Sequence, residues 1–475
     1  MAGRIPTRCA TPQALRPRRP RRLPRPEDGA ELTAFRADAV AALPGPPGLA
    51  ARRLAALERL DALAVPDTTA EEWRYSRIGA LDLDRYAPAT TPSAGALPDA
   101  VEAVIAASGA ATVVVVTDGL GVDVRRRADG VSVGTDDGEE GAASGGRSAG
   151  DVFGGLNDAF SLPLRIEVAA GARPGGVLVV HWLGGAAGVA TFPRTHVVVG
   201  AQAEVELIEL AASAAVDALT VPRTDVEVGD GAIATYLHLQ QLGSQVWQIA
   251  EQASRVGRDA TFSSHAVALG GDYARVRTTS SLVGTGGTTR LLAVYLGTGS
   301  RMVDFRTVQE HRAPRTTSEL LFKGAVANRS QAVYTGLIRV DKGAAGTNAF
   351  QTNRNLVLHQ GARADSVPNL EIEDNDVRCS HASAVGPIDE DQRFYLASRG
   401  VPPEAADRLI TLGFLDEVLQ RMTPRALADH VRRRLVASLD EAEAAEEAAS
   451  AGGGTTGNRA GGPEGPAANP SGAQA

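Results

Sequence analysis

Glycine recurs at an almost constant interval through the middle of the chain, and this spacing constrains the fold more than any other feature. Gly200, Gly229, Gly257 and Gly284 each follow a short apolar or alternating segment, at intervals of 29, 28 and 27 residues. Another strand-like segment begins within a few residues of each glycine; these segments cover residues 204–210, 232–240, 260–268 and 288–296. A unit of this length that repeats without a helical pattern predicts stacked coils, and therefore a β-helix.

An antiparallel sandwich is the alternative fold, because it also combines strands with glycine turns. The steady, long interval favours the β-helix, and strand patterns continue beyond the four repeats. These later strands are predicted at residues 318–325, 331–339, 355–358 and 369–373. Two upstream runs, residues 112–117 and 177–183, are predicted to be buried strands. We therefore place the β-helix core at residues 192–398, preceded by leading strands over residues 91–191.

Helical periodicity flanks this core on both sides. Apolar residues repeat at helical spacing between residues 30 and 90 and between residues 399 and 440, so a helical domain is predicted at each place. Residues 1–29 form a basic tail, with eight arginines and six prolines before the first acid, and are predicted to be disordered rather than a targeting segment. Residues 441–475 and a glycine-rich loop at residues 134–150 are also predicted to be disordered.

Composition excludes several classes of protein. The chain has 475 residues, of which 43% are hydrophobic, and a net charge of -8, whereas a nucleic-acid-binding chain is typically basic. Two cysteines, Cys9 and Cys379, are too few for a disulfide framework. Neither a membrane-spanning apolar run nor the apolar core of a secretory signal is present. We therefore expect a cytoplasmic protein that binds neither membrane nor nucleic acid.

Cys379-Ser380-His381 is the most specific chemical feature of the sequence. A thiolate and an imidazole two residues apart on a strand point to the same face, and both are ligands that suit iron or zinc. Two ligands do not complete a site, so the others would come from His359, a nearby acid, water or another subunit. A small buried thiol beside a hydrogen-bonded histidine is the alternative interpretation.

The other polar residues are less specific. Four acids just upstream suit general acids, metal ligands or, most simply, solvated turn charges; they are Glu371, Glu373, Asp374 and Asp376. The remaining histidines show no close ligand spacing and are interpreted as packed or surface residues; they are His181, His196, His238, His265, His311 and His430. No Walker motif is present, so we do not expect the chain itself to hydrolyse ATP.

The predicted helix over residues 404–422 is apolar around more of its circumference than one neighbour requires. Its apolar residues include Leu409, Leu412, Phe414, Leu415, Val418 and Leu419. Such a helix either docks a partner protein or packs as a cap on the end of the β-helix, and the sequence is compatible with both.

Several stretches together resemble the SufB/SufD family of iron–sulfur cluster assembly proteins. The most specific lie between Gln351 and Leu415 and include Asp376–Gly386 (DVRCSHASAVG) and Phe394–Gly400 (FYLASRG). Gln351–Leu356 (QTNRNL) and Pro368–Ile372 (PNLEI) lie in the same segment, and the supporting stretches are Glu71–Tyr75 (EEWRY) and Leu156–Phe160 (LNDAF). The Cys-Ser-His run is more similar to the SufD branch of the family than to the SufB branch.

This resemblance implies a right-handed parallel β-helix flanked by helical domains, and a non-catalytic scaffold subunit. It implies pairing with a SufB-like paralogue, and docking of a SufC-like ABC-type ATPase through the helices at residues 404–439. His381 matches the histidine that is expected to help hold a nascent cluster where the two paralogues meet, and Cys379 is the neighbouring candidate. We expect no tightly bound cofactor, only a transient iron–sulfur cluster at that interface.

Two other functions also fit a β-helix. A carbohydrate-active enzyme of this fold needs paired carboxylates and aromatic platforms, but aromatic residues make up only 4% of the chain. A purely structural solenoid needs neither metal nor partner chemistry. The family resemblance favours the scaffold over both.

Overall fold

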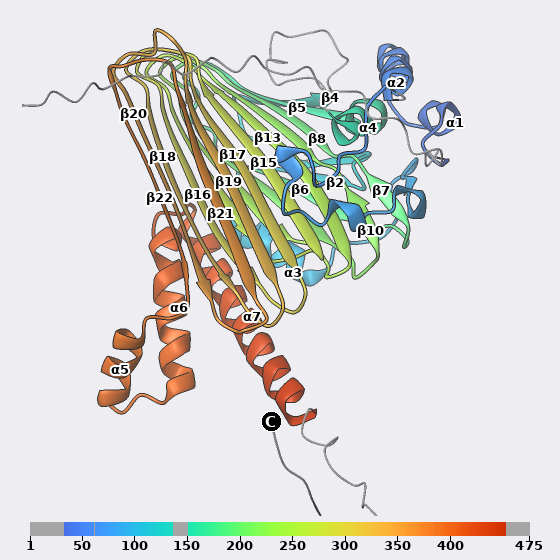
Figure 1. Cartoon of the computed structure of the whole chain (residues 1–475). Coiled ribbons are helices and arrows are strands. Elements are labelled where there is room, and N and C mark those ends of the chain that lie inside the picture. Colours follow the sequence, from blue (N-terminus) through green and yellow to red (C-terminus); the bar gives the residue numbers. More distant parts are fainter. Residues whose placement is uncertain (1–32, 61, 136–150, 453–475) are drawn as a thin grey trace, which may run out of the picture.

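A parallel β-helix forms the centre of the computed structural model, which describes residues 33–60, 62–135 and 151–452 (Figure 1). It is made of one 12-stranded and one 10-stranded sheet. The 12-stranded sheet contains β1 (Ala87–Pro88), β4 (Val131–Thr135), β5 (Pro163–Val168), β7 (Val189–Thr191), β8 (Arg194–Val199), β10 (Ala218–Thr220), β11 (Arg223–Val228), β13 (Val246–Val256), β15 (Tyr273–Leu282), β17 (Met302–His311), β19 (Gln331–Val340) and β21 (Arg363–Ile372). The 10-stranded sheet contains β2 (Thr112–Thr117), β3 (Gly121–Arg126), β6 (Gly175–Leu183), β9 (Glu204–Ser213), β12 (Ile233–Gln241), β14 (Thr261–Ala268), β16 (Thr288–Gly297), β18 (Thr317–Val326), β20 (Thr347–Val357) and β22 (Val377–Gly386).

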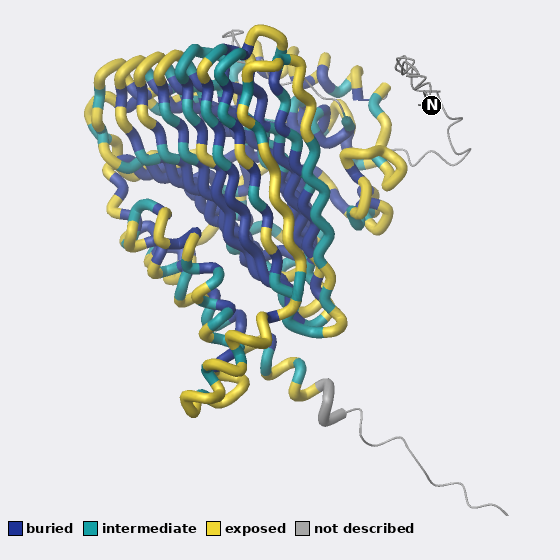
Figure 2. The backbone as a smooth tube through the Cα atoms, turned by 60° about the vertical axis from the view of Figure 1, so that its left-hand side comes forward, coloured by how far each residue is buried: buried dark blue, intermediate teal, exposed yellow. Residues whose placement is uncertain are grey.

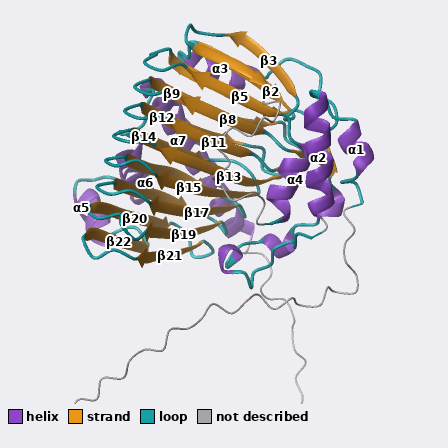
Figure 3. Cartoon of the chain, turned by 90° about the horizontal axis from the view of Figure 1, so that it is seen from above, coloured by secondary structure: helices purple, strands orange, loops and turns teal. Residues whose placement is uncertain are grey.

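From β11 to β22, consecutive strands alternate between the two sheets, and each pairs in parallel with the strand one coil away. The 10-stranded sheet, for example, has the order β22-β20-β18-β16-β14-β12-β9-β6-β2-β3. This confirms the predicted β-helix and excludes the antiparallel sandwich. Figure 3 shows the resulting stack, which runs from β3 at one end to β21 and β22 at the other.

Successive coils approach each other closely at the repeating glycines. A Cβ added at Gly284 would lie 2.0 Å from the backbone nitrogen of Arg258 in the preceding coil, and one at Gly200 would lie 2.5 Å from that of Ala170. No side chain fits at such distances, so the stacked backbones require glycine there. The predicted interval is therefore the length of one coil.

The helices flank this core. They are α1 (Ala37–Ala41), α2 (Pro47–Leu60), α3 (Asp99–Ser108), α4 (Val152–Phe160), α5 (Glu390–Ser398), α6 (Pro403–Leu419) and α7 (Arg425–Gly452), with short 3-10 turns at Glu71–Trp73, Ile78–Ala80 and Leu83–Arg85. In Figure 1, α6 and α7 lie along the 10-stranded sheet. Leu415 and Leu419 of α6 and Leu427 and Val431 of α7 share one buried core with strand residues such as Leu292. These helices therefore cover a side of the β-helix and do not cap its end. Among the described residues, no helix is long and apolar enough to cross a lipid bilayer.

The EEWRY stretch docks the N-terminal segment onto the outer face of the 12-stranded sheet. The Arg275 guanidinium lies 3.8 Å from the centroid of the Trp73 ring, and the same arginine donates a hydrogen bond of 2.7 Å to the Glu72 carbonyl. Asp304, which is fully buried, holds Arg275 at 2.9 Å. These contacts show that the EEWRY stretch attaches the N-terminal segment to the coils of the β-helix.

Asn157 gives the LNDAF stretch a similar structural role. Its side-chain amide donates hydrogen bonds of 3.1 Å and 2.7 Å to the carbonyls of Pro193 and Val221. Both carbonyls lie in short breaks of the 12-stranded sheet, between β7 and β8 and between β10 and β11. Proline has no N–H to donate to a ladder, so the amide of α4 supplies hydrogen bonds where the strands are interrupted.

Several boundaries differ from the prediction. The parallel ladder begins before residue 192, because β6 already pairs with β2 and β8 with β5. It ends at Gly386, and Glu390–Ser398 form a helix outside it. α7 continues to Gly452 because the alanine- and glutamate-rich run has a high helix propensity, so this part of the tail is not disordered as predicted. The basic tail, residues 136–150 and residues 453–475 lie outside the described residues.

Candidate functional site

The last coil leaves one end of the β-helix open. β21 and β22 are the terminal strands of their sheets, so each has one edge without a neighbouring strand among the described residues. Figure 2 shows that the last coil is mostly exposed or half-buried, whereas the earlier coils are buried. Leu370, Ile372 and Val385 are 37%, 43% and 44% exposed on this coil. An exposed strand edge with apolar side chains is a surface on which another strand-rich chain can pair.

β22 carries both predicted ligands on its lumenal face. Cys379 is in register with Ala349 of β20, and His381 is in register with Gln351. The Cys379 side chain is half-buried against an aliphatic cluster that includes Ile338. Burial raises the pKa of the Cys379 thiol, so the free chain holds it as a thiol rather than a reactive thiolate. His381 is exposed because no further coil of the described structure covers it.

The third candidate ligand is not near this pair. His359 accepts a hydrogen bond of 2.7 Å from the Asn328 backbone nitrogen, and its Nδ1 lies 3.5 Å from a carboxylate oxygen of Glu446 on α7. In the part of the chain that the structure describes, no group of three or more His, Cys, Asp or Glu side chains could hold a metal ion. Cys379 and His381 can therefore contribute only to a site that other ligands complete.

Two of the four upstream acids, Glu371 and Asp374, make the turn and surface contacts that the simplest interpretation predicted. Glu371 forms an ion pair of 2.7 Å with Arg339 on the neighbouring strand. Asp374 accepts hydrogen bonds from the backbone nitrogens of Gly343 and Asp376, at 3.2 Å and 3.0 Å.

A buried amide lies directly beneath His381. Gln351 is 1% exposed, and neither its Oε1 nor its Nε2 has a hydrogen-bond partner in the described structure. Its side chain reaches across the lumen towards Gly336, where an added Cβ would lie 2.4 Å from Nε2. Gln351 lies in the QTNRNL stretch, whose sequence pattern predicts no role for it.

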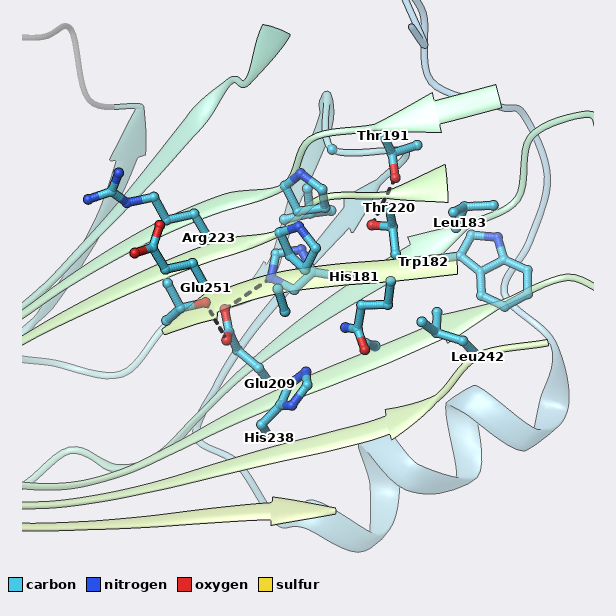
Figure 4. A pocket seen from close by; sticks show the side chains of 18 of the residues that line it. His181, Trp182, Leu183, Thr191, Glu209, Thr220, Arg223, His238, Leu242 and Glu251 are labelled. Atoms are coloured by element: carbon cyan, nitrogen blue, oxygen red, sulfur yellow. Dashed lines mark hydrogen bonds and ion pairs between the residues drawn. The ribbon is translucent and has the colours of Figure 1, made fainter. Parts of the chain in front are cut away.

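A second polar cluster, which the sequence did not reveal, surrounds Glu209 (Figure 4), and the strand order places it towards the opposite end of the stack. Glu209 of β9 is 5% exposed. Its carboxylate accepts hydrogen bonds from Thr224 Oγ1 at 2.8 Å and from the Tyr236 hydroxyl, and it lies 3.1 Å from His181 Nε2. Burial alone would raise the pKa of Glu209, but the contacts with His181 and Tyr236 lower it to about 2. The carboxylate is therefore ionised inside the β-helix.

The surroundings of Glu209 are polar but tightly enclosed. Burial lowers the pKa of His238 to about 4, so this imidazole is neutral at pH 7. His181 Nδ1 and both amide atoms of Gln248 have no hydrogen-bond partner in the described structure. These side chains line a cavity of about 30 Å³, which is room for about one or two water molecules. The cluster can hold a charge and a small hydrogen-bonding molecule, but no larger substrate.

The coil length is the signal that would have revealed this cluster. Glu209 and His238 are register partners on adjacent strands, 29 residues apart, and His181 precedes Glu209 by 28 residues. Residues one interval apart lie in neighbouring coils, so the spacing that predicted the fold also brings these polar groups together.

The predicted docking residues of α6 are divided between the core and the surface. Leu415, Val418 and Leu419 are buried against the 10-stranded sheet, and their side chains are not available to a partner in this conformation. Leu412 and Phe414 are partly buried on the same core, whereas Leu409 is 55% exposed. The neighbouring helix α5 adds two exposed aromatic side chains, Phe394 at 76% and Tyr395 at 57%.

Comparison with known proteins points to one family. Residues 181–414 match the family model described as "SUF system FeS cluster assembly, SufBD core domain". The chain is 32% identical over 292 residues to the iron–sulfur cluster assembly protein SufD of Escherichia coli, a match that covers 60% of this chain and 69% of that protein. It is 36% identical over 221 residues to an iron–sulfur cluster assembly SufBD family protein of Mycobacterium tuberculosis, covering 45% and 55%. It is 31% identical over 219 residues to SufD of Bacillus subtilis, covering 46% and 49%.

The region that matches the family model contains both polar sites described above. The chain spans about half the length of the mycobacterial and Bacillus relatives and more than two thirds of the Escherichia coli protein. The family model runs from β6 to α6, so it includes the lumenal cluster, the open coil and the start of the C-terminal helices. The chain belongs to the SufB/SufD family of iron–sulfur cluster assembly proteins, and within that family it is most similar to SufD.

Proposed function

We propose that the chain is a non-catalytic scaffold subunit for iron–sulfur cluster assembly, which works in a complex with a SufB-like paralogue and a SufC-like ATPase. The observation that carries this proposal is the incomplete ligand pair, Cys379 and His381, on the open last coil. Thiolates and imidazoles are the ligands that hold iron–sulfur clusters. A pair of them at an unpaired strand edge suits a cluster that is cargo, held only while a partner supplies the other ligands.

The paralogue would pair with the open end. From Cys379 to Gly386, β22 carries no charged residue, so no charge opposes the approach of a second strand along this edge. The exposed Ile372 and Val385 would become buried. A partner of the same architecture would place its own last coil against this one and enclose both candidate ligands.

The ATPase would dock on the exposed apolar residues of α5 and α6, namely Phe394, Tyr395 and Leu409. An ion pair of 2.8 Å between Arg393 of α5 and Asp407 of α6 ties the two helices together. The buried side of α6 packs on β16 and β18, so a force applied to these helices would act directly on the 10-stranded sheet that carries β22.

Affinity purification of the tagged full chain under anaerobic conditions tests this assembly. We expect a SufB-like paralogue and an ABC-type ATPase to co-elute. Val385→Lys on β22 should release the paralogue, whereas Val124→Lys should not, because Val124 is equally exposed but lies on β3 at the other end of the same sheet. Leu409→Asp should release the ATPase, and the exposed Leu54→Asp on α2 is its control.

The ligand role needs a separate measurement. His381→Ala should leave both partners bound but abolish cluster formation on the purified complex, followed by its visible absorbance. If the full chain elutes alone, the scaffold proposal is wrong. If the complex forms and matures clusters normally with His381→Ala, the chain contributes architecture and not a ligand.

A further inference from the structure

Gln351 has an environment that its own coil does not explain. A buried amide with neither atom hydrogen-bonded loses its hydration without compensation, and such groups are rare in folded proteins. Gln351 is 1% exposed, and neither of its amide atoms has a partner among the described residues. A methionine would fill the same space without this cost, so packing alone does not account for a glutamine here.

The neighbours of Gln351 in its own coil and the coil below offer no hydrogen-bond partner to its amide in the described structure. The residue in register one coil below is Leu320, which is apolar and buried. Across the lumen, Gly336 has no side chain, and the nearby Tyr334 hydroxyl already shares a hydrogen bond of 3.0 Å with Thr307. A partner for the Gln351 amide can therefore come only from the other side, where β22 of the last coil lies.

His381 is the residue in register directly above Gln351. Partners in a parallel ladder point to the same face, about 4.8 Å apart along the stack. His381 therefore projects over the buried amide, and it is exposed because the stack ends there. Its imidazole can turn down to the amide without displacing another side chain of a higher coil.

We propose that Gln351 is the positioning residue of His381. Its amide oxygen accepts a hydrogen bond from one imidazole N–H, and the other ring nitrogen then faces out of the open end. Histidine ligands are commonly held in this way by a second group that fixes both tautomer and ring orientation. The value of this arrangement for a cluster rests on the function proposed above, but the contact itself is a property of this chain alone.

Tautomer measurement on the full-length chain tests the contact directly. The chain is labelled with ¹⁵N-histidine, and His381 is identified among the eight histidines by comparison with His381→Ala. We expect His381 to show a single fixed tautomer in the wild type. Gln351→Met, which keeps the side-chain length but removes the acceptor, should give the averaged signal of a free imidazole, and Gln351→Glu should restore the fixed tautomer.

Gln248 provides a matched control. It is also a buried glutamine with both amide atoms unpartnered, but it lies in the cavity beside Glu209. Gln248→Met should leave the His381 signal unchanged. A His381 signal that is the same in wild type and Gln351→Met, or one that is already averaged in the wild type, would overturn the proposal.

A second measurement separates this inference from the proposed function. In the assembled complex, Gln351→Met should slow cluster formation by about 10-fold, the lower range for loss of a group that orients a ligand, with both partners still bound. If Gln351→Met changes the tautomer but neither it nor His381→Ala affects cluster formation, the contact stands and the ligand role in the proposed function is wrong.

Discussion

Two buried polar residues, one near each end of the β-helix, differ in how their hydrogen bonds are met. Near the first end, the charged Glu209 carboxylate is buried but receives hydrogen bonds from Thr224 and Tyr236 and contacts His181. Near the last coil, the uncharged Gln351 is just as buried but receives none within the described structure. The satisfied group holds the coils together, whereas the unsatisfied one lies where the chain leaves a surface for something else. Gln248, beside Glu209, also lacks partners for both amide atoms in the described structure, so what distinguishes Gln351 is its place directly beneath the open last coil.

The edge strands at the two ends of the β-helix also differ, in the charge that they carry. β3 turns back antiparallel on β2 and ends the stack with charged side chains, among them Asp123 and Arg125. Arg125 also forms an ion pair of 2.7 Å with Glu102 of α3. Charges on an edge strand discourage pairing with another chain. β22 carries no charge beyond Arg378, so of these two edge strands β22 is the one suited to extension by a partner.

The largest effect is expected at the satisfied end. Glu209→Leu removes a carboxylate and leaves Thr224, Tyr236 and His181 without their buried partner. Breaking a buried charged network of this kind costs about 3–5 kcal/mol, and urea denaturation of the full chain measures it. Glu206→Leu, a half-buried position on the same strand, should cost less than about 1 kcal/mol. Equal costs at the two positions would remove the basis of the comparison.

The second-largest effect is expected from acid, which should lower the free energy of unfolding through His238, the neighbour of Glu209. Burial lowers the pKa of His238 to about 4 in the folded chain, while an unfolded histidine titrates near 6.5. Between these values the unfolded state binds more protons, so stability falls as pH falls from about 6.5 to about 4. At pH 5 this amounts to roughly 2 kcal/mol from His238. Urea denaturation at pH 7 and pH 5 should show a smaller loss for His238→Gln; an equal loss in both chains would mean that His238 is protonated when folded.

The sequence predicted the coils well and the contacts between coils poorly. The glycine interval identified the β-helix and most of its strands because close backbone stacking imposes glycine at one place in each coil, as at Gly284. The same interval places Glu209 beside His238 and Gln351 beneath His381. Finding these pairs requires the exact register, which depends on where each coil gains or loses a residue, and no local pattern gives that.

The C-terminal helices show a different limit. Helical periodicity revealed the apolar face of α6, but it does not say which neighbour covers that face. In the structure, the 10-stranded sheet takes Leu415 and Val418, and Leu409 stays exposed. The end of α7 was predicted to be disordered from its low-complexity composition, yet alanine and glutamate continue a helix that has already begun.

The open end should tolerate change far better than the closed end. Gln351→Met removes the proposed hydrogen bond to the exposed His381 together with one unpartnered amide nitrogen, and it keeps a similar volume, so the free energy of unfolding should change by less than about 1 kcal/mol. Urea denaturation of Gln351→Met and Glu209→Leu, each compared with the wild type, measures this difference in stability. A loss above about 2 kcal/mol would show that Gln351 has a buried partner in the folded chain, and that the two ends are alike.

The smallest effect on stability is expected at His381, where the effect on function should be greatest. The side chain is exposed on a terminal strand, and exposed substitutions away from caps and buried networks usually change stability by less than about 0.5 kcal/mol. His381→Ala should therefore unfold at the same urea concentration as the wild type, yet fail to form a cluster in the complex. A stable chain that has lost its chemistry would mark the open end as a surface kept for a partner and its cargo. A chain destabilised as much as Glu209→Leu would instead make His381 part of the packing, and the difference between the two ends would disappear.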